Sequence, residues 1–180
     1  EHKFNQLIED IKKAQHHIHI CYYIFRGDDL GKRIVEALEE RAKNGVEVRV
    51  LYDAVGARTL KKSLFKKLEE YGGETETSFA SRVHLLNIRL NYRNHRKIVV
   101  IDGKVGYTGG FNVGDDYLSQ YENMGYWRDT HLKIQGSAVH QLQQRFIIDW
   151  NASKKVEMLA YESSYFPIIP IQGDKEIQII

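Results

Sequence analysis

Hydrophobic and polar residues alternate along this chain with two different periods, and the succession of these periods predicts a layered α/β domain. Apolar residues at helical spacing mark four segments, residues 5–15, 30–43, 60–71 and 137–150. Runs rich in β-branched and aromatic residues mark strands at residues 17–25, 46–55, 97–102, 104–109 and 130–135. Strands that alternate with helices predict an α/β sandwich in which helices flank a mixed β-sheet.

The remaining segments carry weaker patterns. Residues 74–82 lack periodicity, so we expect a loop there, whereas residues 85–90 are weakly strand-like. Residues 113–126 favour a polar loop or a short helix. The dipeptide Asp102-Gly103 favours a tight hairpin turn between the two strands that it separates.

The C-terminal part differs from the rest of the chain. Residues 152–172 are irregular and contain both prolines, Pro167 and Pro170, and residues 176–180 resemble the start of a strand. We therefore predict one domain over residues 1–152, followed over residues 153–180 by a linker and the first strand of another domain. Because the chain begins at Glu1 and soon enters a helical pattern, we also expect it to be part of a longer protein.

Composition changes this picture little. The formal net charge is only +2, so any basic surface must be local. Cys21 is the only cysteine, which excludes an internal disulfide and favours a reducing compartment. No run approaches the ~18 apolar residues of a membrane-spanning helix. The basic segment 61–67 favours a solvated helix face, with contact to anionic lipid headgroups as the alternative.

The most informative stretch is an H-x-K-x4-D motif formed by His95, Lys97 and Asp102. A histidine and a lysine two residues apart on a strand point to the same face. A neutral imidazole is a competent nucleophile near pH 7, and a nearby cation can stabilise the oxygens of a phosphorus under attack. This pairing predicts phosphodiester chemistry through a phosphohistidine intermediate, with His95 as nucleophile and Lys97 as the stabilising cation.

Three further residues are candidates for substrate binding or orientation. Gly110, in a Gly-Gly pair, lets a backbone approach closely, and Asn112 can donate a neutral hydrogen bond. Asp129 is the candidate acid that holds the second imidazole nitrogen and fixes the tautomer. The alternative for Asp129 is an ordinary carboxylate at a strand edge.

For Asp102 and for the three clustered histidines, a purely structural role is at least as well supported as a role in chemistry. Asp102 either belongs to the site or only forms the hairpin turn with Gly103. His16, His17 and His19 lie close together, but no cysteine or carboxylate cluster accompanies them, so we do not expect a metal there.

Taken together, these motifs resemble the phospholipase D superfamily, and the residues around them resemble its bacterial cardiolipin synthase branch. The similarity lies in residues 94–115, residues 127–132, the helix that ends at Asp149-Trp150, and residues 165–174. It is weakest over residues 74–90. The resemblance implies a phospholipase D-like α/β/α sandwich that forms one half of a two-domain enzyme and needs neither a metal nor a cofactor.

The resemblance also implies a reaction and its partners. His95 would take a phosphatidyl group from one phosphatidylglycerol, release glycerol, and pass the group to a second phosphatidylglycerol to give cardiolipin. The full H-x-K-x4-D motif occurs once, so the histidine that acts as general acid and base must come from a following domain or a dimer mate. The implied partners are anionic phospholipid and, through a longer parent protein, the bacterial cell membrane at its cytoplasmic face. Nucleic acid is not expected.

Other functions remain open. A single-motif nuclease of the same superfamily would dimerise to complete its site, and a basic groove with stacked aromatic side chains would favour it. A non-catalytic phospholipase D-like half is the third reading, against which the intact pair of His95 and Lys97 argues. The acceptor, whether a glycerol headgroup, water or another alcohol, is also open.

Overall fold

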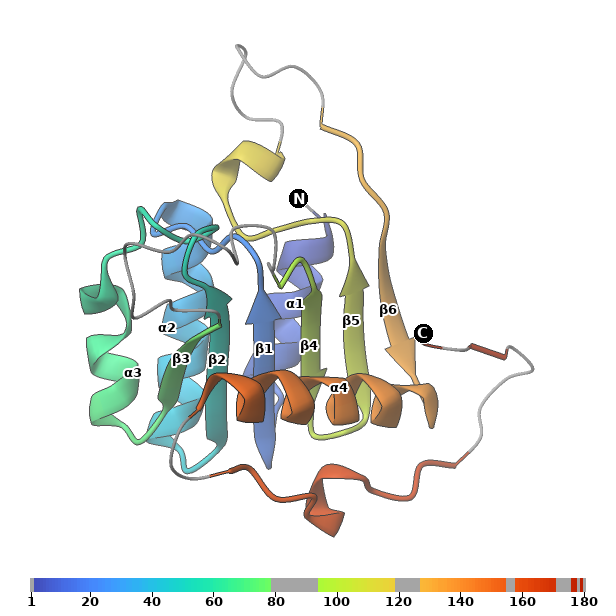
Figure 1. The fold of residues 1–180 in the computed structure, drawn as a ribbon. Helices are drawn as coiled ribbons and strands as arrows, with labels where there is room; N and C mark the ends of the chain where they lie inside the picture. Colours follow the sequence, from blue (N-terminus) through green and yellow to red (C-terminus); the bar gives the residue numbers. More distant parts are fainter. Residues whose placement is uncertain are drawn as a thin grey trace.

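A computed structural model describes residues 2–78, 94–118, 127–154, 158–170, 176–177 and 179. Its centre is a six-stranded sheet in the order β3-β2-β1-β4-β5-β6 (Figure 1). The strands are β1 (His17–Tyr22), β2 (Glu47–Asp53), β3 (Glu74–Ser78), β4 (Lys97–Ile101), β5 (Val105–Gly109) and β6 (His131–Gln135). Strands β1 to β3 are parallel, whereas β4 pairs antiparallel with both β1 and β5, and β6 pairs antiparallel with β5.

Helices cover both faces of the sheet (Figure 1). Helices α1 (His2–Lys12) and α2 (Asp29–Lys43) cover one face, and α4 (Ala138–Ser153) crosses the other. Helix α3 (Lys66–Glu70) packs beside α2. The described residues also form the short 3-10 helices η1 (Lys62–Phe65), η2 (Asp115–Leu118) and η4 (Ser163–Tyr165). The predicted α/β sandwich with a mixed sheet is therefore confirmed.

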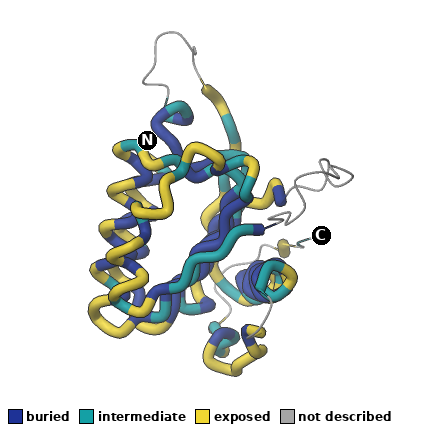
Figure 2. Tube along the Cα trace, turned by 60° about the vertical axis from the view of Figure 1, so that its left-hand side comes forward, coloured by how far each residue is buried: buried dark blue, intermediate teal, exposed yellow. Residues whose placement is uncertain are grey.

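The two faces of the sheet bury separate hydrophobic cores, and Figure 2 shows the buried residues between sheet and helices. Alternation along β1 assigns Ile18 and Ile20 to the core under α1 and α2, and Cys21 to the core under α4. All six residues of β1 are buried because helices cover this central strand from both sides.

The expected loop at residues 74–82 is wrong over residues 74–78, which form β3, and its remainder lies outside the described residues. The sequence of β3, Glu-Thr-Glu-Thr-Ser, has no apolar alternation, and among the described strands it pairs with β2 alone, at the edge of the sheet. Pairing of backbone groups with β2 rather than side-chain burial specifies this strand. The predicted helix at 60–71 forms as η1 and α3 in succession. The predictions for residues 85–90 and 119–126 fall outside the described residues.

Part of the predicted linker packs against the domain. Leu159 and Tyr165 are buried in the core under α4, and the hydroxyl of Tyr165 donates to the carboxylate of Glu47 at 2.8 Å. The domain boundary at residue 152 remains a prediction. Within the described part of the chain, no helix combines the length and the apolar character that crossing a membrane requires.

Candidate active site

Strand direction brings the candidate residues of the H-x-K motif and the Gly-Gly pair to one end of the sheet, which we call the His95 end. Strand β4 begins there at Lys97, while β1 ends there at Tyr22 and β5 ends there at Gly109. His95 itself lies in the loop just before β4, not in the strand. The sequence pattern predicted that strand alternation would point the side chains of His95 and Lys97 to one face. Because His95 lies outside the strand, alternation does not determine the direction of its side chain.

The ring of Tyr23 brings the histidine and the lysine together. His95 stacks on Tyr23 with ring centroids 4.0 Å apart and an interplanar angle of 17°. The ammonium of Lys97 lies 5.6 Å from the centroid of the same ring and donates to the carbonyl oxygen of His95 at 2.6 Å. Tyr23 was not among the predicted site residues, because it fell inside the predicted strand at residues 17–25, whereas β1 ends at Tyr22, opposite Lys97.

The ammonium group of Lys97 can interact with an anionic substrate. Burial lowers the pKa of Lys97, and the nearby carboxylate of Asp129 opposes that effect. The ammonium is bonded to a carbonyl, and no carboxylate among the described residues contacts it, so within this part of the chain its charge is not neutralised by direct contact. Remaining N–H groups on the ammonium can donate to the oxygens of a phosphoryl group.

Gly110 and Asp129 are neighbours, and the glycine is needed to make room for the carboxylate. A side chain at Gly110 would overlap the carboxylate of Asp129. The N–H of Gly110 donates to the carbonyl of Thr130 at 2.9 Å, and the N–H of Thr130 donates to Asp129 at 2.8 Å. Among the described residues, Asp129 forms no hydrogen bond with His95, and its negative charge opposes the lowering of the Lys97 pKa.

Asn112 is buried near the His95 end and links two loops. Its Oδ1 accepts from the N–H of Ile24 at 3.1 Å, and its Nδ2 donates to the hydroxyl of Tyr117 at 3.0 Å. One N–H of the amide is left after these bonds. Its contacts explain how the loop after β1 is held against the loop after β5, and its role in substrate binding remains a prediction.

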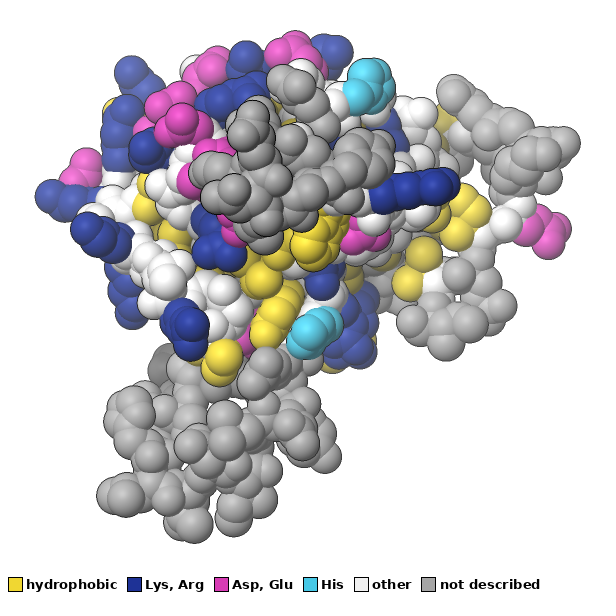
Figure 3. Space-filling view, turned by 90° about the horizontal axis from the view of Figure 1, so that it is seen from above, with side chains coloured by type: hydrophobic (Ala, Val, Ile, Leu, Met, Phe, Trp, Pro, Cys, Tyr) yellow, Lys and Arg dark blue, Asp and Glu magenta, His cyan; other side chains and the backbone are white. Residues whose placement is uncertain are grey.

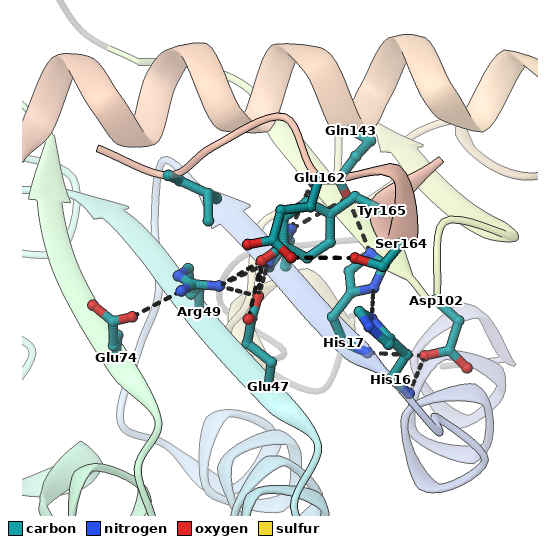
Figure 4. A network of polar contacts seen from close by, with 12 residues as sticks. His16, His17, Glu47, Arg49, Glu74, Asp102, Gln143, Glu162, Ser164 and Tyr165 are labelled. Atoms are coloured by element: carbon teal, nitrogen blue, oxygen red, sulfur yellow. Dashed lines mark hydrogen bonds and ion pairs between the residues drawn. The ribbon is translucent and has the colours of Figure 1, made fainter. Parts of the chain in front are cut away.

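Asp102 lies at the other end of β4, roughly 16 Å along an extended strand from Lys97. We call this the Asp102 end of the sheet (Figure 4). The Asp102 carboxylate accepts from the backbone N–H groups of Gln15, His16 and His17, at 2.9, 2.8 and 3.0 Å respectively. Its φ of 53° is followed by a φ of 64° at Gly103, as a hairpin turn of type I′ requires. The structure thus does not bring Asp102 to His95, and its contacts fit the turn-forming alternative.

A buried polar frame, absent from the sequence prediction, holds the backbone on both sides of His95. The backbone N–H of Asn94 donates to Asp53, and its side-chain amide donates to Asp149, both at 3.2 Å. The N–H of Arg96 donates to the side-chain oxygen of Asn94 at 3.2 Å, and its guanidinium contacts Asp149 at 3.4 Å. The exposed histidine therefore projects from a loop whose flanking residues are fixed.

The three clustered histidines belong to a hydrogen-bonded network at the Asp102 end, in which Figure 4 labels His16 and His17. Nδ1 of His16 contacts Nδ1 of His17 at 2.8 Å, and Nε2 of His17 contacts Gln143 at 3.2 Å. His19 contacts Gln143 through Nδ1 and Glu47 through Nε2. Burial lowers the pKa of His17 to about 3 and lowers the pKa of His19 as well. The neutral rings of His17 and His19 serve as internal hydrogen-bonding groups.

Seen from above, the His95 end presents hydrophobic side chains among lysines and arginines (Figure 3). A groove of about 550 Å³ opens beside His95 and Lys97 and runs along α4. The arrangement therefore combines an exposed imidazole, a cation that is not neutralised by direct contact, and an adjoining space for part of a substrate. These are the elements that attack on a phosphodiester requires.

Comparison with known proteins adds the family context. The family described as "Cardiolipin synthase, PLD-like domain", where PLD denotes phospholipase D, matches residues 7–150. The major cardiolipin synthase ClsA of Bacillus subtilis is 53% identical over 178 residues, which cover 99% of this chain and 37% of that protein. The chain thus spans little more than a third of this relative's length.

Solved structures share the fold at low sequence identity. Phosphatidylserine synthase of Haemophilus influenzae aligns with a TM-score of 0.64 and 18% identity, over 83% of this chain and 35% of that chain. Nuc of Salmonella typhimurium, a phospholipase D family member, aligns with a TM-score of 0.58 and 17% identity, over 83% of this chain and 88% of that chain. The same fold therefore occurs both within a longer chain and as almost an entire chain.

Proposed function

Because this chain belongs to the cardiolipin synthase family of phospholipase D-like domains, we propose that it provides one half of a phosphatidyltransferase site. The reaction converts two phosphatidylglycerol molecules into cardiolipin and glycerol. Phosphatidylglycerol is a membrane lipid, so in this proposal the His95 end of the sheet faces the bacterial cell membrane. We place it at the cytoplasmic side of that membrane. The observation that carries the proposal is the convergence of His95 and Lys97 on Tyr23 in a chain 53% identical to a cardiolipin synthase.

The chemistry proceeds in two displacements at phosphorus. A ring nitrogen of His95 attacks the phosphodiester, the bond from phosphorus to the glycerol headgroup breaks, and a general acid gives that oxygen a proton. A hydroxyl of the second phosphatidylglycerol then attacks phosphorus, its proton passes to the same group acting as base, and the bond to His95 breaks. Lys97 stabilises the charge on the non-bridging oxygens in both steps.

The general acid and base is the histidine of a second H-x-K-x4-D motif. This sequence has another H-x-K pair, His131 and Lys133, but Ala138 stands where the aspartate of a complete motif would be. We propose that the general acid and base comes from a second phospholipase D-like domain, in the same polypeptide or in a dimer mate. The greater length of the cardiolipin synthase relative supports the first arrangement. The likeness to Nuc, whose chain is almost covered by this fold, supports the second arrangement and the alternative of a dimeric nuclease.

Within this scheme the other candidates take supporting roles. Asp129 acts through the charge of Lys97, whose surroundings it shares. Asn112 and Gly110 shape the loops beside the reacting groups, and the remaining amide N–H of Asn112 is available to substrate. Asp102 holds the opposite end of β4 to the start of β1 and takes no part in the chemistry.

The test is an assay of phosphatidyl transfer with radiolabelled phosphatidylglycerol and the second domain present. Cardiolipin and glycerol should form in equal amounts without added metal, and the His95→Ala variant should form neither. A parallel assay with a labelled oligonucleotide addresses the nuclease alternative. Cleavage of the oligonucleotide without any phosphatidyl transfer would contradict the proposed function.

A further inference from the structure

The groove beside His95 is built from the sheet on one side and α4 on the other. Alternation along β4 and β5 places Ile98 and Thr108 on the face that α4 crosses. Helix α4 contributes residues at helical spacing, among them Gln141, Arg145 and Ile148. The groove thus continues directly from the reacting histidine onto one face of a single helix.

Part of its lining is apolar, formed by Ile98, Leu142, Ile148 and Ile179. Ile148 is 47% exposed although it faces the groove, and Leu142 forms part of the floor. On the edge strand β6, Leu132 is 51% exposed and is the cross-strand neighbour of Thr108, which lines the groove. Large apolar side chains are therefore left uncovered along the path that leads away from His95.

The groove lacks the stacking surfaces that a single-stranded nucleic acid uses. Arg96, Lys97 and Arg145 line it, and the two arginines share one buried carboxylate, that of Asp149. Among the described lining residues, His95 carries the only aromatic ring. A groove for single-stranded nucleic acid combines cations with several aromatic rings on which bases stack.

We propose that this groove binds the glycerol backbone and the first methylene groups of the acyl chains of the phospholipid that His95 attacks. The inference rests on the proposed function and adds the location of the apolar part of the substrate. A phosphodiester held at His95 carries the headgroup on one oxygen and diacylglycerol on the other, and the apolar substituent needs an apolar surface beside the phosphorus. A volume of about 550 Å³ holds only the part of the chains nearest the glycerol.

The test is a chain-length series measured by NMR titration of this chain. The ligands are water-soluble phosphatidylglycerols with short acyl chains of increasing length, kept below their micelle concentrations, and deacylated glycerophosphoglycerol. Affinity should rise about fourfold for each methylene group buried, and should stop rising once the groove is filled. Ile148→Glu should remove the dependence on chain length and leave the affinity for glycerophosphoglycerol unchanged.

Matched variants separate this inference from the alternatives. Ile168, in the described segment 158–170, is 99% exposed and does not line the groove. The control variant Ile168→Glu should therefore keep the full dependence of affinity on chain length. Ile148→Ala, which adds no charge, should lose part of it, and urea unfolding checks that each variant is folded. If glycerophosphoglycerol binds but acyl chains add no affinity, or if both glutamate variants act alike, the groove assignment fails while the proposed function stands.

If neither phosphatidylglycerol nor glycerophosphoglycerol binds and an oligonucleotide does, the proposed function itself fails. If Ile148→Glu instead dissociates a dimer of this chain in sedimentation, the groove is a protein interface and the assignment is overturned.

Discussion

The His95 end and the Asp102 end of the sheet both carry histidines, but they differ in whether the ring nitrogens have partners. At the Asp102 end, His17 and His19 are fully buried and bond to Gln143 and Glu47. At the His95 end the imidazole is exposed and stacked on a tyrosine, and among the described residues its nitrogens accept or donate no hydrogen bond. A group that must form a bond to phosphorus needs such an open nitrogen, whereas a group that holds a core together needs each nitrogen occupied.

The largest expected effect separates the two ends directly. In an enzyme that contains both motifs, His95→Ala should lower phosphatidyl transfer by about 10⁴-fold or more, on the scale of a lost nucleophile. Because the side chain is exposed, the free energy of unfolding should change by only about 0.5 kcal/mol. His19→Ala should do the reverse, with about 1–3 kcal/mol of lost stability and normal transfer per folded molecule. Transfer rates and urea unfolding of both variants check this contrast, and a catalytic loss confined to His19→Ala would reverse our assignment.

The buried end should also make stability depend on pH. Burial lowers the pKa of His17 to about 3, so the folded protein binds fewer protons there than the unfolded chain does. Stability from this group is present above the ordinary histidine pKa of about 6.5 and falls by about 1.4 kcal/mol per pH unit below it, until about pH 3. Urea unfolding between neutral and acidic pH measures the slope, which His17→Phe should reduce. An unchanged slope in that variant would show that other groups cause it.

Removal of the cation at the His95 end should have a smaller effect than removal of the nucleophile. Lys97→Ala should lower the rate of transfer by about 10²–10³-fold, as expected for one lost contact to developing negative charge. The exposed Lys104 in the turn between β4 and β5 provides the matched control, because Lys104→Ala should leave the rate unchanged. Equal losses in the two variants would indicate a general effect of positive charge on lipid binding.

The smallest expected effect concerns Asp102. Asp102→Ala removes the acceptor of three backbone N–H groups, two of which are exposed and can bond to water instead. The free energy of unfolding should therefore fall by about 1–2 kcal/mol, while transfer per folded molecule stays unchanged. Denaturant titration and rate measurements on one preparation give both quantities. A loss of transfer without a loss of stability would return Asp102 to the catalytic group.

The local pattern predicted the helices, most of the strands and the H-x-K motif, because periodicity and motif spacing lie within short stretches of sequence. Strand β3 escaped prediction because its polar residues are specified by pairing with β2. The frame around His95 escaped for a related reason. Asn94 reaches Asp53 and Asp149, residues 41 and 55 positions away, and no local pattern records such contacts. Motif spacing likewise grouped Asp102 with His95 and Lys97, but spacing alone could not show that Asp102 lies at the far end of β4.

The central claim is that the exposed imidazole of His95 becomes phosphorylated during turnover. The most direct measurement is a denaturing quench at alkaline pH, which preserves the bond from phosphorus to nitrogen, during turnover of phosphatidylglycerol labelled at phosphorus by the two-motif enzyme, followed by mass spectrometry of the peptide that contains residues 94–97. We expect a phosphatidyl adduct on His95 that appears within one turnover and is absent from His95→Ala. An adduct found only on the partner motif's histidine, with His95 unmodified throughout, would contradict the central claim.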